Sequence, residues 1–150
     1  MHPYILRETV ISMAINMLFS LAFFLAVFTV GAPVRVWGMG GYALDALPQS
    51  AAIAAMSTLV PGFIALRQVR RGRLARLREG NALPRNIWLR ALVMALAAMA
   101  LGGALSAAVL LMLGLHTIAW AAALAAKLAY GAALAGVVTP PTLRAALAAS

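Results

Sequence analysis

The stretch LRQVRRGRLARLREGNALPRNIWLRA, residues 66–91, carries eight arginines and divides the chain into two apolar halves. Four long apolar segments flank it in pairs, and the one charged residue inside them is Lys127. Of the 150 residues, 65% are hydrophobic, which is far more than the core of a soluble domain of this size requires. The excess has to face lipid, so the sequence predicts an all-α integral membrane protein that forms a single domain over residues 1–150.

The predicted membrane spans cover residues 9–30, 47–66, 91–115 and 117–138. At a rise of about 1.5 Å per residue the first span reaches about 33 Å, enough for a hydrocarbon core of about 30 Å. Pro61 removes a backbone donor inside the second span and predicts a kink there. Only residues 114–116 can form a turn between the last two spans, and Pro140 and Pro141 are expected to end the fourth helix. The expected architecture is a four-transmembrane-helix bundle built of two helical hairpins.

The positive residues predict the orientation of these spans. Arg35 is the one arginine on one side of the four-span arrangement, and the other ten arginines all fall on the opposite side. Positive residues near span ends are retained in the cytoplasm, so both termini and the loop 67–90 are expected there. This pattern indicates a multi-pass protein of the bacterial inner (cytoplasmic) membrane.

The arginine-rich loop has two interpretations. It orients the protein and binds anionic lipid headgroups, or it docks a cytoplasmic partner. Leucines that share a face with Leu66 suggest a helix lying on the membrane surface. The residues expected at the headgroups are Arg67, Arg70, Arg71, Arg73, Arg76 and Arg78.

Lys127 is the residue least suited to its position. It lies eleven residues from His116 and eleven from Val138, or about 16 Å from either surface of the predicted span. An ammonium ion there costs at least about 2.5–3.5 kcal/mol, so it needs a partner or has to lose its proton. Glu8 and Asp45 are expected at span ends, with Asp45 as a helix cap. The partner is therefore expected to be uncharged and polar, or water, an anion, or an acid on another polypeptide.

The first span offers a polar stripe, in which Thr9, Ser12, Asn16 and Ser20 share one helical face. By counting rise, Asn16 lies about 5–6 Å to the cytoplasmic side of Lys127, so the first and fourth helices are expected to be neighbours. Alternatively, such a stripe only forms hydrogen bonds that hold neighbouring helices together. The candidate intramembrane site consists of Lys127, Asn16, Ser12, Ser20, Tyr130 and Trp120.

Several classes of function are excluded or disfavoured by composition. The chain has no cysteine, two histidines and three acids, so no metal site, cofactor or thiol chemistry is expected. No nucleophile is paired with a base, so the protein is not expected to be an enzyme. The net charge of +9 belongs to membrane-flanking loops, and no nucleic-acid binding is expected.

Two hypotheses of function remain. The first is a non-enzymatic accessory or scaffolding component of a membrane assembly, in which Lys127 pairs with an acid on a partner's helix. The second is a small permease-like transporter, working as a homo-oligomer, in which Lys127 serves an anionic substrate or a proton. The plan of four short helices resembles that of small multidrug resistance transporters. Those transporters depend on a carboxylate inside the first helix, where this chain has Asn16.

Overall fold

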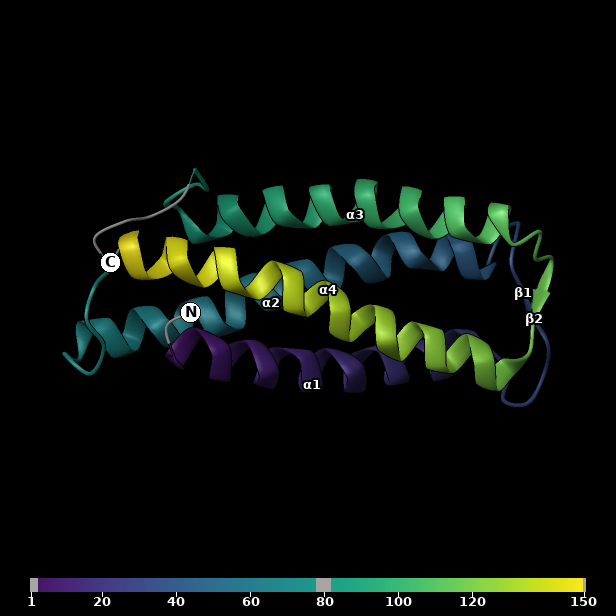
Figure 1. The fold of residues 1–150 in the computed structure, drawn as a ribbon, viewed down its shortest axis with the longest axis horizontal. Helices are drawn as coiled ribbons and strands as arrows, with labels where there is room; N and C mark the ends of the chain where they lie inside the picture. Colours follow the sequence, from purple (N-terminus) through teal and green to yellow (C-terminus); the bar gives the residue numbers. More distant parts are fainter. Residues whose placement is uncertain (1–2, 78–81, 150) are drawn as a thin grey trace.

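The computed structural model describes residues 3–77 and 82–149, which form four long helices and one pair of short strands (Figure 1). Each helix is long and apolar enough to cross a membrane, so the predicted all-α class with four membrane-length helices is confirmed for the described residues. In chain order the elements are α1 (Pro3–Val27), β1 (Val34–Arg35), α2 (Tyr42–Arg70), α3 (Ile87–Met112), β2 (Thr117–Ile118) and α4 (Trp120–Ala149).

The helices pack mainly between the two halves of the chain. The most extensive contacts join α1 to α4, α2 to α3 and α2 to α4, whereas α3 and α4 touch little. The predicted neighbourhood of the first and fourth helices is therefore confirmed. The interface between consecutive helices is small in both halves, so neither half packs as a self-contained hairpin.

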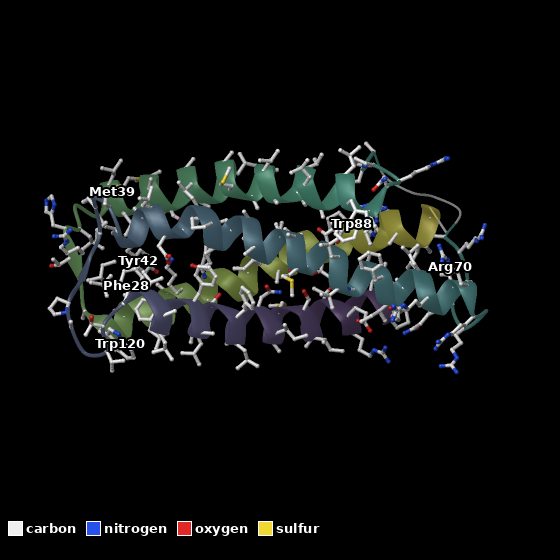
Figure 2. All side chains as sticks on the ribbon, turned by 180° about the vertical axis from the view of Figure 1, so that it is seen from behind. Phe28, Met39, Tyr42, Arg70, Trp88 and Trp120 are labelled. Atoms are coloured by element: carbon white, nitrogen blue, oxygen red, sulfur yellow. The ribbon has the colours of Figure 1, made fainter. Side chains whose placement is uncertain are left out.

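The two ends of the bundle differ in structure and charge. At one end, called the strand end, β1 pairs antiparallel with β2 through Val34 with Ile118 and Arg35 with Thr117. The other end, called the arginine end, holds both termini and the connection from α2 to α3 (Figure 1). Phe28, Tyr42 and Trp120 gather at the strand end, opposite Arg70, as Figure 2 shows.

Helices α1 and α2 begin earlier than predicted, at Pro3 and Tyr42. As a result, Glu8 and Asp45 lie inside helices rather than before them. The N-cap of α2 is Gly41 in an extended conformation, so the predicted capping role of Asp45 is wrong. Both carboxylates are largely buried, with Glu8 at 6% exposure and the Asp45 side chain at 8%.

The prediction that Pro140 and Pro141 end the fourth helix is also wrong, because α4 continues to Ala149. A proline ring fits the helical φ, but it removes a backbone donor and crowds the carbonyl four residues earlier, so other interactions have to offset that cost here. The hydroxyl of Thr142 donates to the carbonyl of Val138 at 2.9 Å within this turn. Beyond the prolines, Leu143 and Leu147 are buried in a cluster completed by Tyr4, Ile5 and Ala65. Burial of those side chains favours continuation of the helix.

The described part of the arginine-rich connection does not form the surface helix that the leucine pattern suggested. Helix α2 ends at Arg70, and residues 71–77 are turns and irregular chain. Leu74 and Leu77 pack back onto the buried cluster that contains Leu143. These leucines therefore anchor the connection between α2 and α3 to the arginine end of the bundle.

Candidate functional site

Lys127 forms an ion pair with Asp45 inside the bundle. Its ammonium nitrogen Nζ lies 2.5 Å from Oδ2 of Asp45, and the two side chains are 2% and 8% exposed. The same nitrogen donates to Oε1 of Gln49 at 2.6 Å and lies 4.7 Å from the centre of the Tyr42 ring. Three polar or aromatic groups of α2 therefore solvate the cation of α4.

The polar contacts continue from this pair to α1. The amide Nε2 of Gln49 donates to Oγ of Ser20 at 2.9 Å. We call the four residues Asp45, Lys127, Gln49 and Ser20 the lysine cluster. It links α4, α2 and α1, and it lies in the half of the bundle nearer the strand end. Lys127 is seven residues from the start of α4 at Trp120, or about 10 Å along the helix axis.

The expectation that this chain has no acid near Lys127 is wrong, and helix length explains why. With α2 starting at Tyr42 rather than at residue 47, Asp45 lies in the first turn and Gln49 one turn further on. Positions four residues apart share a helical face, so both can reach the same lysine. The four-residue spacing of Asp45 and Gln49 was the sequence signal that could have revealed this.

A second group of polar side chains lies nearer the arginine end. The amide Nδ2 of Asn16 donates to the carbonyl of Ser12 at 2.8 Å and to Oγ of Ser57 at 3.0 Å. Thr139 of α4 donates to Oγ of Ser12 at 3.0 Å, and Ser12 donates to Ser57 at 3.3 Å. We call Ser12, Asn16, Ser57 and Thr139 the asparagine cluster. The predicted polar stripe of α1 is thus buried, but Asn16 bonds to this cluster and not to Lys127.

Tyr130 and Trp120, the other two predicted site residues, form no hydrogen bond to Lys127 within the described part of the chain. The Tyr130 hydroxyl is 2.5 Å from Oγ of Ser50, which in turn donates to the carbonyl of Ala46. Trp120 packs edge-on against Phe24, with ring centres 5.7 Å apart. Trp120 therefore belongs to the aromatic cluster at the strand end.

The close approach of α1 and α4 depends on a glycine. A Cβ atom placed on Gly131 would overlap the hydroxyl of Ser20 and lie 3.1 Å from the carbonyl oxygen of Asn16. Gly131 is one turn from Lys127, at the level where α1 passes from one polar cluster to the other. A larger residue would separate the two helices at the level where Ser20 accepts its hydrogen bond from Gln49, and so would disturb the lysine cluster.

The two clusters open on different sides of the bundle. A groove of about 420 Å³ between α3 and α4 is lined by Lys127, Tyr42 and Tyr130 together with apolar side chains. A smaller pocket of about 60 Å³ between α1 and α2 is lined by Ser12 and Asn16 of the asparagine cluster. Each cluster can therefore be reached from one lateral opening.

The predicted headgroup arginines lie at the arginine end. Arg67, Arg70, Arg71, Arg73 and Arg76 are exposed, whereas Arg78 lies outside the described residues. Arg90 behaves differently, because it is 1% exposed and donates at 2.9 Å to the carbonyls of Pro84, Arg85 and Thr142. It joins the start of α3 to the proline-containing turn of α4 and is a structural residue.

Among residues 3–77 and 82–149, no three His, Cys, Asp or Glu side chains are grouped so that they could hold a metal ion. The chain matches no protein-family model, no curated protein and no solved structure. The geometry of the two polar clusters is therefore the basis for any functional proposal.

Proposed function

We propose that this chain is a small, non-enzymatic membrane transporter that exchanges a proton at the Asp45–Lys127 pair. The observation that carries the proposal is the burial of this pair between two membrane-length helices. Ionisable side chains at such positions are costly and are typically functional, and a buried ion pair is seldom more stabilising than apolar side chains of the same volume. A pair retained for stability alone is therefore the weaker explanation.

The chemistry of the pair suits proton exchange. Transfer of one proton from Nζ of Lys127 to Oδ2 of Asp45 leaves a neutral amine and a carboxylic acid, so no net charge is created in the bundle. The distance of 2.5 Å allows this transfer without movement of the helices. The amine can then accept a proton from the groove between α3 and α4. The carboxylic acid of Asp45, in the first turn of α2, releases its proton to water at the strand end. Gln49 keeps Lys127 aligned in either state, because its Oε1 accepts and its amide is fixed on Ser20.

The separate openings support transport rather than simple storage of a charge. The lysine cluster faces the groove between α3 and α4, and the asparagine cluster faces the pocket between α1 and α2. The backbone of α1 joins the clusters over the single turn from Asn16 to Ser20. Alternating access requires a site that opens in turn toward the two faces of the membrane, and openings at two depths of the bundle are compatible with it.

The orientation and location are part of the same proposal. We place the arginine end, with both termini, in the cytoplasm and the strand end outside, in a bacterial inner membrane. The exposed arginines at positions 67, 70, 71, 73 and 76 then contact anionic headgroups of the inner leaflet. Reporter fusions after Gly40 and after Arg76 test this placement, because an external signal at Arg76 would contradict it.

Proton flux across proteoliposomes tests the transport activity. Vesicles containing the purified protein and an internal pH dye should dissipate a pH gradient faster than empty vesicles. The Asp45→Asn variant should lose this flux, because the amide cannot take up the proton. Arg35→Gln is the matched control, since Arg35 is an exposed charge at the same end of the bundle. Vesicles that contain this variant should show the proton flux of the parent. Equal flux in the Asp45→Asn variant and in the parent would refute the proposal.

An accessory role is the second candidate, and one observation favours it. Asp45 now fills the place of the acid that a partner was expected to supply, so this role no longer rests on Lys127. It rests on α3, whose Leu101 and Leu105 are 73% and 64% exposed beside a second apolar groove of about 370 Å³. A partner helix or a second copy of the chain could pack there. Stoichiometric copurification of another membrane protein, lost in a Leu101→Gln variant, would support this role.

A further inference from the structure

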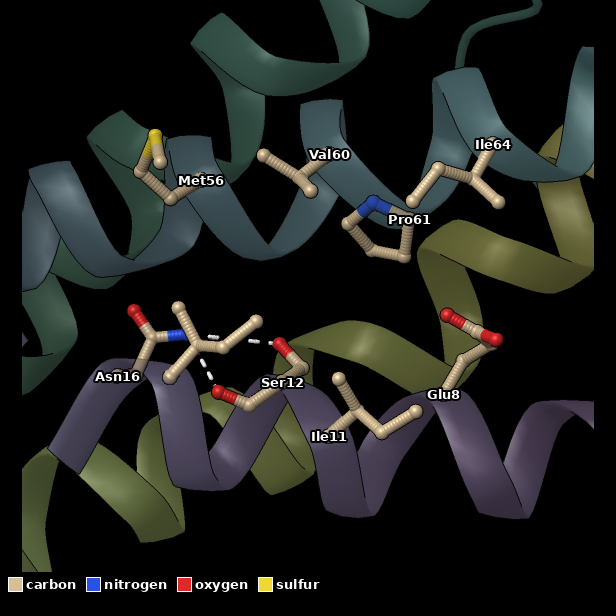
Figure 3. A pocket seen from close by; sticks show the side chains of 9 residues that line it. Glu8, Ile11, Ser12, Asn16, Met56, Val60, Pro61 and Ile64 are labelled. Atoms are coloured by element: carbon tan, nitrogen blue, oxygen red, sulfur yellow. Dashed lines mark hydrogen bonds between the residues drawn. The ribbon is translucent and has the colours of Figure 1, made fainter. Parts of the chain in front are cut away.

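The pocket between α1 and α2 contains a combination of groups that the proton-exchange proposal does not use. Figure 3 shows Glu8, Ser12 and Asn16 of α1 facing Met56, Val60 and Pro61 of α2. The cavity measures about 60 Å³, several times the minimum of about 10–15 Å³ that one water molecule needs. It is therefore large enough to hold a small polar group.

Asn16, one of the residues that line this pocket, has an unused hydrogen-bond acceptor. The residue is 2% exposed, and within the described part of the chain its Oδ1 is buried with no hydrogen-bond partner. Its amide hydrogens are already used, because Nδ2 donates to Ser12 and Ser57. The hydroxyls of Ser12 and Ser57 are committed to the asparagine cluster as well. What Asn16 offers to a ligand is an oxygen that only a donor can satisfy.

Glu8 adds a negative charge to the same pocket. It is 6% exposed, and its Oε1 accepts from Arg7 at 2.9 Å, while the Arg7 side chain is 65% exposed and lies outside the pocket lining. Pro61 has no N–H to offer, and the remaining lining side chains are aliphatic or Met56. The lining thus provides a carboxylate and an amide oxygen as acceptors without a free side-chain donor beside them.

The mouth of the pocket is apolar and faces sideways. Ile11, Ile15, Val60 and Ile64 line it and remain about 40–45% exposed on the surface that would meet lipid. A ligand that enters here passes between aliphatic side chains before its polar end reaches Glu8 or Asn16, which lie about 12 Å apart along α1. Such a site suits a molecule with a charged donor at one end and a hydrocarbon part at the other.

We infer that the α1–α2 pocket binds alkyl primary amines in their ammonium form. The ammonium group would pair with the Glu8 carboxylate or donate to Oδ1 of Asn16 as it passes, and the alkyl chain would lie between Ile11 and Val60. Charge-assisted hydrogen bonds to buried acceptors are the strong kind, so the N–H groups are part of the recognition. The inference rests on the proposed transport function only where alkylammonium ions are taken as the transported substrates. Binding of these ions to the pocket does not depend on transport.

Thiol protection in the cysteine-free chain tests the site directly. Met56→Cys places a single thiol at the pocket, and Leu113→Cys places one at the exposed strand end as a control. In lipid nanodiscs, butylammonium should slow the labelling of the Met56→Cys protein and leave the Leu113→Cys protein unchanged. Butyltrimethylammonium, which has the same charge without N–H groups, should protect much less.

Two further changes identify the groups responsible. Adding Glu8→Gln should raise the concentration of butylammonium needed for protection by about tenfold or more, because it removes the charged acceptor. Val60→Phe fills the cavity from a half-exposed position without touching the polar groups, and it should abolish protection even if Glu8→Gln fails to fold. Unchanged labelling of Met56→Cys, equal slowing at position 113, or equal protection by butyltrimethylammonium would each overturn the inference.

The proposed binding site and the proposed transport activity can be refuted independently of each other. Loss of butylammonium protection with proton flux intact would refute the substrate class alone. Protection that persists in a protein without proton flux would leave the binding site standing and refute the proposed transport.

Discussion

Replacing Lys127 by methionine should destabilise the protein markedly. The methionine keeps the apolar stem of the lysine, but it leaves the carboxylate of Asp45, which is 8% exposed, without its cation. Oε1 of Gln49 loses its donor in the same step. Breaking a buried ion pair by removing one partner costs about 3–5 kcal/mol, a large part of a typical stability of about 5–15 kcal/mol.

A double-mutant cycle separates the pair from the rest of the bundle. Asp45→Leu should cost a similar amount, whereas Lys127→Met combined with Asp45→Leu should return close to the parent, since replacing both charges by apolar groups is neutral or stabilising by about 1–4 kcal/mol. Arg35→Met removes an exposed charge and should stay within about 0.5 kcal/mol. Reversible unfolding in mixed micelles, followed by helical circular dichroism, measures all four. A Lys127→Met protein as stable as the parent would refute the ion pair.

Two other positions give distinct signatures. Gly131→Leu should separate α1 from α4 at Ser20 and cost about 1–3 kcal/mol or more in the same unfolding assay, while Ala129→Leu on the exposed face of α4 should be nearly neutral. Arg90→Met should loosen the α3–α4 junction at the arginine end, because three carbonyls lose a charged donor, and backbone amides of residues 138–149 should exchange hydrogen faster. Arg85→Met, at an exposed arginine, should leave that exchange unchanged.

Sequence reasoning found the features that lipid imposes directly. The four apolar segments and the single charged residue inside them follow from the cost of exposing polar groups to hydrocarbon, which leaves a strong compositional signal. The burial of Asn16 and Lys127 follows from the same cost, and both are 2% exposed. The contact between α1 and α4 was predicted for that reason as well.

The partners of those residues were not predictable from hydropathy. A span boundary placed five residues late moved Asp45 outside the helix, although a carboxylate in a first turn is compatible with an α-helix. A charged residue such as Asp45 lowers the mean hydropathy of its segment. A span predicted from hydropathy therefore ends before such a residue and leaves it out of the helix. The end of the fourth helix was predicted wrongly at Pro140 and Pro141 for a related reason. The burial of Leu143 and Leu147 against other helices outweighs the loss of local hydrogen bonds at the prolines.

The most direct test of the proposed proton exchange is pH-difference infrared spectroscopy of the carboxyl groups in reconstituted protein. If Asp45 takes up a proton, acidification should produce a protonated-carboxyl band that disappears reversibly when the pH is restored. The band should be absent from the Asp45→Asn variant and retained in Glu8→Gln. A spectrum that is identical for the parent and the Asp45→Asn variant across the pH range in which the fold is intact would contradict the account.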